Sequence, residues 1–97
     1  MLFGTLAVEV KKIGNYNLIP TADGIFFRSN NNFLIVHVEK KSLKLEILLN
    51  KQISNIKKLD KVEMENENRY RHYLSISQTK EIGPPLIDAL KEAYNIA

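Results

Sequence analysis

The first thirteen residues carry apolar side chains with the period of a helix. These side chains recur at steps of three and four residues: Phe3, Leu6, Ala7, Val10 and Ile13. That spacing places them on one face of an α-helix. Gly14 and Asn15 follow, and both residue types tolerate the left-handed conformation that commonly ends a helix. We therefore predict an N-terminal helix that stops near residue 14.

The centre of the chain has the two-residue period of β-strands. Residues 33–39 and 42–49 are rich in β-formers and flank Lys40-Lys41. If they pair as a hairpin, six apolar side chains share one side: Leu34, Val36, Val38, Leu43, Leu45 and Ile47. A slip of one residue would divide this set between both faces, so the register is strongly preferred. Lys-Lys suits a tight turn poorly, and a longer loop over residues 39–42 would keep the same pairing.

Shorter elements are expected on both sides of this hairpin. Residues 16–19, stopped by Pro20, and residues 24–28 form two strands, joined by a turn in which Asp-Gly supplies positive φ angles. Further along, residues 62–64 begin a strand, 65–68 make a polar turn, and residues 70–76 alternate as the final strand. In between, Ile53, Ile56 and Leu59 are spaced by threes, which favours a helical turn within residues 50–61.

The last helix starts after Ser77, Gln78 or Thr79, with Pro84-Pro85 in its first turn. Its apolar stripe is Leu86, Leu90, Ala93, Tyr94 and Ala97, with Ile87 beside it. The fold class that follows is α+β: a twisted antiparallel sheet of about five strands with an N-terminal and a C-terminal helix, the latter packed on the sheet's apolar face. No repeat or linker divides residues 1–97, which we expect to form a single domain.

Composition adds few constraints. The absence of cysteine excludes disulfide and thiolate chemistry and fits a cytoplasmic location. The longest apolar run, Phe33–Val36, is far too short to span a bilayer, so we expect no membrane partner. The net charge of +3 permits an anionic partner without requiring one. Its distribution is more informative, because residues 40–61 hold seven lysines against Glu46 and Asp60.

A basic, aromatic-containing surface is the main candidate site. Alternation places Arg69, Arg71 and Tyr73 on one side of the last strand, and Lys44 with His37 on the polar side of the hairpin. Arginine binds phosphate in a bidentate manner and tyrosine stacks on bases. The alternative is an ordinary solvated face whose arginines pair with Glu46, Glu65 or Glu67. Lysines at loops and sheet edges also discourage edge-to-edge pairing without any ligand.

The two histidines, His37 and His72, are the other candidates. On one sheet face they would make an acid/base pair or two metal ligands. Neither has Asp, Glu or Cys at ligand spacing, and two ligands do not complete a zinc site. We expect two half-exposed strand residues, no metal and no cofactor. Glycine-rich phosphate loops and nucleophile elbows are absent from the sequence, so no catalytic residue is predicted.

Two stretches resemble a known family. Residues 69–77 followed by 87–94, and the hairpin residues 39–45, are similar to a small bacterial domain-of-unknown-function family. Its members are sometimes labelled "predicted transport protein" and are often attached to restriction-type nuclease or defence proteins. The resemblance implies an α+β domain and no known reaction. Gly83-Pro84-Pro85 departs from the family pattern and shifts the start of the last helix.

These observations lead to two functional hypotheses. The first is a non-catalytic binding module that contacts nucleic acid, or a nucleic-acid-processing partner, through Arg69, Arg71, Lys44 and the lysine cluster. The second is a protein-interaction or homodimerisation domain, in which a sheet edge or the side bearing Phe33, Ile35 and Leu48 meets a partner. A small enzyme ranks third, because too few polar groups converge to suggest a reaction.

Overall fold

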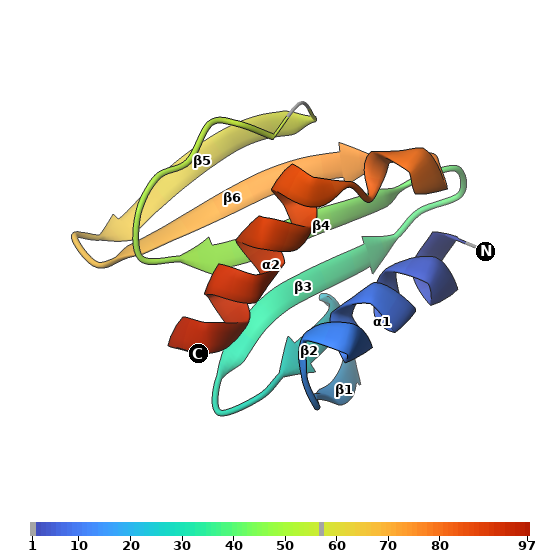
Figure 1. Cartoon of the computed structure of the whole chain (residues 1–97), viewed down its shortest axis with the longest axis horizontal. Coiled ribbons are helices and arrows are strands. Elements are labelled where there is room, and N and C mark those ends of the chain that lie inside the picture. Colours follow the sequence, from blue (N-terminus) through green and yellow to red (C-terminus); the bar gives the residue numbers. More distant parts are fainter. Residues whose placement is uncertain (1, 57) are drawn as a thin grey trace.

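In the computed structural model, which describes residues 2–56 and 58–97, two helices lie on the same face of an antiparallel sheet (Figure 1). The elements are α1 Leu2–Ile13, β1 Asn17–Thr21, β2 Gly24–Arg28, β3 Asn32–Val38, β4 Leu43–Leu49, β5 Leu59–Asn66, β6 Arg69–Ile76, a short 3₁₀ helix η1 Thr79–Glu81, and α2 Pro84–Ile96. The α+β class is confirmed. The sheet has six strands rather than the five expected.

The strand order is β1-β2-β3-β4-β6-β5, so the chain does not place β5 beside β4. The segment from β4 to β5 must therefore pass over β6. Residues 50–56 and 58 form no helix, and the predicted helical turn within residues 50–61 is wrong. The three-residue spacing has another cause: Ile56 is buried and Ile53 and Leu59 are partly buried while the chain crosses β6 without regular structure.

The β3–β4 hairpin has the predicted register. Val36 lies opposite Leu45, and the longer of the two expected loops joins the strands, with the N–H of Glu39 donating to the carbonyl of Ser42 at 2.9 Å. Five of the six predicted side chains are buried in the core. Val38 is not, since 59 % of it is exposed. Alternation fixes the side to which Val38 points, but this last residue of β3 lies beyond the packed centre of that side.

β1 continues through Pro20, which was predicted to stop it. Proline lacks the N–H that a central strand must donate, but β1 is an edge strand, where such a donor is dispensable. Residues 22 and 23 make the turn to β2, and Gly24 follows with φ of 138°. It is the one residue with a positive φ in the described part of the chain.

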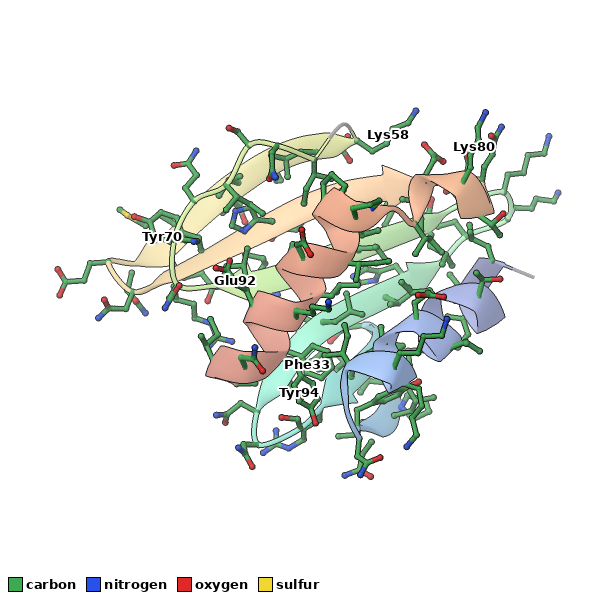
Figure 2. The ribbon with its side chains drawn as sticks, in the orientation of Figure 1. Phe33, Lys58, Tyr70, Lys80, Glu92 and Tyr94 are labelled. Atoms are coloured by element: carbon green, nitrogen blue, oxygen red, sulfur yellow. The ribbon has the colours of Figure 1, made fainter. Side chains whose placement is uncertain are left out.

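A bulge changes the position of Phe33. The pairing of β2 with β3 shifts between Phe27 and Arg28, which leaves Phe33 as an extra residue. Phe33 is fully buried on the helix side, with its ring 5.3 Å from that of Tyr94 and 6.4 Å from that of Phe27 (Figure 2). The prediction that Phe33 shares the outer face with Ile35 and Leu48 is therefore wrong.

Both helices bury the stripes expected of them. α1 buries Leu6 and Val10. α2 buries Leu86, Ala89, Leu90 and Ala93, and its two prolines lie in the first turn as predicted. The predicted start after Ser77, Gln78 or Thr79 is wrong, because Gly83 precedes α2 and Gln78 precedes η1 instead. α1 ends at Ile13, but Gly14 does not adopt the left-handed conformation assumed for it. No helix in the described residues is long and apolar enough to cross a membrane.

Candidate functional site

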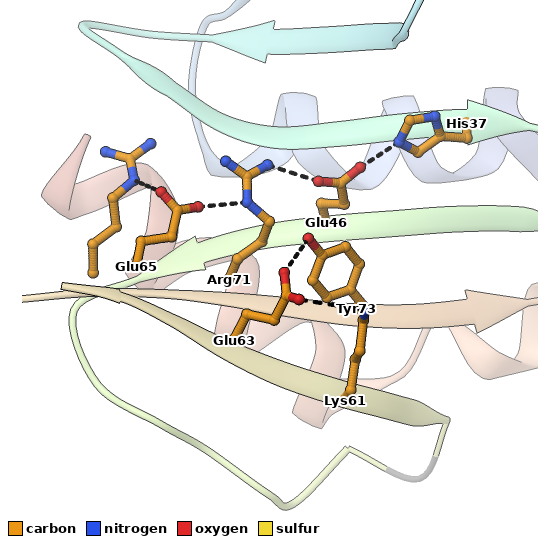
Figure 3. Close-up of polar contacts among 8 residues, drawn as sticks. His37, Glu46, Lys61, Glu63, Glu65, Arg71 and Tyr73 are labelled. Carbon is orange, nitrogen blue, oxygen red and sulfur yellow. Dashed lines mark hydrogen bonds and ion pairs between the residues drawn. The ribbon is translucent and has the colours of Figure 1, made fainter.

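The sheet face opposite the helices carries a linked set of polar side chains (Figure 3). Alternation brings them there from four neighbouring strands. His37 comes from β3, Glu46 from β4, and Arg71 and Tyr73 from β6. β5 adds Lys61 and Glu63, which lie opposite Tyr73 and Arg71 in the sheet. We call this side the open face.

Glu46 connects His37 to Arg71. One oxygen of its carboxylate is hydrogen-bonded to Nε2 of His37, and the other accepts a hydrogen bond from Nη1 of Arg71 at 2.6 Å. The Glu46 side chain is only 15 % exposed, so these contacts lie in a partly desolvated environment. A carboxylate placed in this way fixes the orientation of the imidazole.

Glu65 holds both arginines of the predicted site. Nε of Arg71 donates to one Glu65 oxygen at 2.5 Å, and Nε of Arg69 lies 3.5 Å from the other. Burial alone would lower the pKa of Arg71, but its hydrogen bonds to Glu65 and Glu46 raise that pKa above the ordinary value. Both arginines are thus engaged with carboxylates of their own chain.

Tyr73 is engaged as well. Its hydroxyl donates to Glu63 at 2.7 Å, and this bond raises the pKa of Tyr73 to about 12. The same bond, together with the charge of Lys61, lowers the pKa of the Glu63 carboxyl. The Lys61 ammonium lies 4.7 Å from the centre of the Tyr73 ring, within cation–π range. One face of the ring is therefore already covered.

A shallow hollow of about 400 Å³ opens between these groups. His37, Lys44 and Tyr73, three of the five predicted site residues, line it together with Glu46 and Lys61. Arg69 and Arg71 do not. Two further carboxylates, those of Glu39 and Asp60, complete a lining in which positive and negative groups nearly cancel. The hollow therefore has no strong preference for an anion.

His72 lies on the other side of the sheet. It is fully buried, and Ile47 and Val62 are its cross-strand neighbours. Its Nε2 accepts a hydrogen bond from the backbone N–H of Ile53 at 3.0 Å, and burial lowers its pKa. The proposed pair of His37 and His72 on one face is wrong, as is the expected half exposure of His72. Within the described residues, no three His, Cys, Asp or Glu side chains are placed to hold a metal.

A second candidate region lies at one end of the sheet. Because Leu43 pairs with Ile76, the loop at residues 39–42 lies beside residues 77–81, and the pairing of Leu59 with Leu74 brings Lys58 to the same end. We call this region the basic end. Its charged residues are Lys40, Lys41, Lys44, Lys58, Lys80, Glu39, Asp60 and Glu81, and Asp60 accepts a hydrogen bond from Ser75 at 3.2 Å. Figure 2 shows Lys58 and Lys80 there.

The basic end carries most of the net charge of the molecule. Five lysines against Glu39, Asp60 and Glu81 give +2, and the other nine basic and eight acidic residues of the sequence nearly cancel. Sequence reasoning missed Lys80, which lies outside the lysine-rich segment. It included Lys51, which instead pairs with Glu92 at 2.9 Å. Only the strand register shows that Lys80 belongs to the basic end and that Lys51 does not.

Glu81 is an ionised carboxylate that neutralises part of this end through Lys58. Its carboxylate accepts hydrogen bonds from the backbone N–H groups of Ser77 and Gln78 at 2.8 and 2.9 Å, and lies 3.3 Å from Lys58. These donors lower the pKa of Glu81 to about 2. Its charge is thus already shared among several partners.

Fold and surface together define a small α+β domain with one uncovered sheet face and one basic end. The chain belongs to the DUF5655 family, a domain of unknown function whose family model matches residues 1–97. The resemblance seen in the sequence is confirmed to that extent. No curated protein and no solved structure matches the chain.

Proposed function

We propose that this domain is a non-catalytic binding module whose basic end contacts the phosphate backbone of a nucleic acid. The observation that carries the proposal is the cluster of five lysines at the basic end, which gives it +2 of the net charge of +3. Phosphate contacts supply most non-specific affinity for nucleic acids, and they need clustered cations rather than a high total charge.

The basic end supports this function better than the arginines do. Lys40, Lys41 and Lys80 form no ion pair within the part of the chain that the structure describes, so their ammonium groups are solvated and available. Arg71 would have to leave two carboxylates before it could bind phosphate. That exchange gains little, because one set of charge-assisted hydrogen bonds replaces another.

The family resemblance supplies the context. Attachment to restriction-type nuclease or defence proteins would bring the basic end close to nucleic acid in the cytoplasm. The transport label suggests no chemistry that these residues match. The open-face groups bond to one another and face no convergent acid, base and nucleophile, so the proposal includes no reaction.

A titration with labelled DNA across a salt series tests the proposal. Each phosphate contact contributes about 0.9 to the slope of log K against log salt. Replacement of Lys40, Lys41 and Lys80 by glutamine should reduce that slope by roughly 2 to 3. The control is a triple glutamine variant of Lys11, Lys51 and Lys91, which removes the same charge elsewhere and should change the slope little.

Three outcomes contradict the proposal. Equal losses in both triple variants would show that total charge, not the basic end, matters. No binding at about 50 µM protein and low salt, the weak end of non-specific affinity, would leave the basic end as a solvated surface. Loss of binding in an Arg69→Ala and Arg71→Ala variant with an intact basic end would move the contact to the open face.

The alternative, a protein-interaction or homodimerisation domain, has less support. The edge strand β1 contains Pro20, which has no N–H to donate, and the pairing of the edge strand β5 is irregular at two points. Both features hinder strand addition. Ile35 and Leu48 on the open face are each only 5 % exposed. Their neighbours cover them, so these two leave little apolar surface for a partner.

A further inference from the structure

The connection from β4 to β5 is held on the sheet by the packing of Ile53 and Ile56 against the core and by few polar contacts. We call its described residues, 50–56 and 58, the strap. The strap crosses the helix side of β6 without helix or strand structure, because β6 separates the strands that it joins. Figure 1 shows it passing beside α2 toward β5. α2 packs on β3 and β4, so the strap is the cover for this part of β6.

Three polar contacts tie the strap to α2, η1 and β6, and the carbonyl of Ile56 also accepts a hydrogen bond from the N–H of Leu59 in β5 at 3.2 Å. At its ends, Lys51 pairs with Glu92 at 2.9 Å and Lys58 pairs with Glu81 at 3.3 Å. Both lysines are more than half exposed, and such pairs contribute little to stability. In the middle, the N–H of Ile53 donates to Nε2 of the buried His72 at 3.0 Å. This central bond is the one made away from water.

Because Nε2 accepts this bond, the proton of a neutral His72 is on Nδ1. Nδ1 is buried and makes no hydrogen bond of good geometry in the described residues. The backbone groups of Tyr70 and Ile47 beside the imidazole favour its protonated form, but less than burial disfavours it. A second proton would have to enter at Nε2, the atom that now accepts from Ile53.

Among residues 2–56 and 58–97, no charged group is placed to stabilise an imidazolium at this site. The side chains opposite it are Ile47 on β4 and Val62 on β5. α2 turns apolar residues toward the sheet, and Tyr70 is the titratable side chain two residues from His72 on the same side of β6. The charged members of β4, β5 and β6 nearest in sequence lie on the open face: Glu46, Lys61, Glu63 and Arg71. The strap lysines reach outward to Glu92 and Glu81.

We propose that His72 makes the strap a proton-sensitive cover: protonation converts Nε2 from acceptor to donor, removes the Ile53 hydrogen bond and releases the strap from β5 and β6. The surrounding structure leaves space for this movement. A cavity of about 430 Å³ lies between the strap and the start of α2, lined by Asn55 and Ile56 on one side and Leu86 on the other. Release uncovers Leu74 and His72 and leaves the packing of the helices intact.

The direction of the pH dependence follows from the burial of His72. Burial lowers the pKa of His72 while the strap is closed, and the open state returns it to about 6.5. The open form therefore binds more protons. The closed strap is favoured above pH 6.5, and its ratio to the open form falls about tenfold for each pH unit below that value.

Amide hydrogen exchange, followed by NMR between pH 7.5 and about 5, measures the opening directly. After correction for intrinsic rates, the protection of the Ile53 amide should fall about tenfold per pH unit below 6.5. Amides of Leu45 and Ile47 in the central hairpin should keep their protection. Equal loss at those positions would show global unfolding and overturn the proposal.

Two variants assign the effect to one histidine. His72→Gln keeps a carbonyl acceptor for Ile53 but cannot titrate, so the pH dependence should disappear. His37→Asn removes the other histidine, on the opposite face, and should leave it unchanged. If His72→Gln does not fold, the ring signals of His72 in the natural protein decide: an imidazole that stays neutral while Ile53 opens refutes the mechanism.

Discussion

Replacement of Gly14 by alanine tests why a glycine follows the first helix. A Cβ atom at residue 14 would lie 2.4 Å from the hydroxyl oxygen of Tyr94 and 2.5 Å from its Cζ. The ring cannot simply turn away. It packs edge-on against Phe33 at 5.3 Å, and its hydroxyl donates to the carbonyl of Asn15 at 2.8 Å. Gly14 is therefore required by the approach of α2, not by its own backbone conformation.

The expected cost comes from this collision. Added atoms in a packed site typically cost 1–3 kcal/mol, and a displaced Tyr94 hydroxyl loses a hydrogen bond that contributes about 1 kcal/mol. We expect Gly14→Ala to lower the free energy of unfolding by about 2–3 kcal/mol. For a domain of this size that corresponds to a fall in Tm of roughly 10–20 °C.

A double-mutant cycle with Tyr94→Ala, followed by denaturant unfolding, shows whether the cost comes from the collision with the Tyr94 ring or from the backbone conformation of residue 14. If the ring is the cause, Gly14→Ala should cost almost nothing once Tyr94 is alanine. Gly4→Ala is the matched control, because its Cβ would meet nothing within 4 Å and alanine favours α1 by about 0.5–1 kcal/mol. A cost at Gly14 that is the same with and without the Tyr94 ring would refute the collision.

Three further predictions follow from burial, titration and surface. Val36→Asp should prevent folding, because it buries an unpaired charge, whereas Val38→Asp on the same strand face should melt close to the natural protein. Glu81→Gln should flatten the loss of stability in acid: the carboxylate contribution is complete above about pH 4.5 and disappears as the pH falls toward 2, which unfolding curves at pH 5 and pH 2.5 can show. Sedimentation at high concentration should find a monomer, and a dimer that persists after mutation of the β5 edge would place an interface on another surface.

The sequence predicts the central hairpin well because both of its strands obey one simple rule. Alternation sets the register of Val36 against Leu45, and a slip would have put apolar side chains in water. The same rule fails at Val38. Alternation predicts the side of the sheet to which Val38 points, but not whether other residues cover it there. It also fails at Phe33. A bulge adds one residue to the strand there, and Phe33 points to the side opposite to the one that alternation predicts.

His72 shows a different limit. It is in step with Leu74 and Ile76 on the final strand, so alternation alone places it on the helix side, opposite to His37. Its complete burial was not predictable in this way. Burial depends on the strap, and the course of the strap depends on β6 lying between β4 and β5.

The candidate site has the same dependence on strand order. Arg71 meets Glu46 because β6 pairs with β4, and it meets Glu65 because β5 pairs with β6 on the other side. A chain in which β5 lay next to β4 would leave the same arginine with different partners. Proximity in sequence is equally misleading for the lysines. Lys80 lies at the basic end with Lys40 because Leu43 pairs with Ile76, whereas Lys51 lies elsewhere and pairs with Glu92. An experiment that removed lysines by their position in the sequence would mix residues from two ends of the molecule, and would report a weak effect even if the basic end alone binds phosphate.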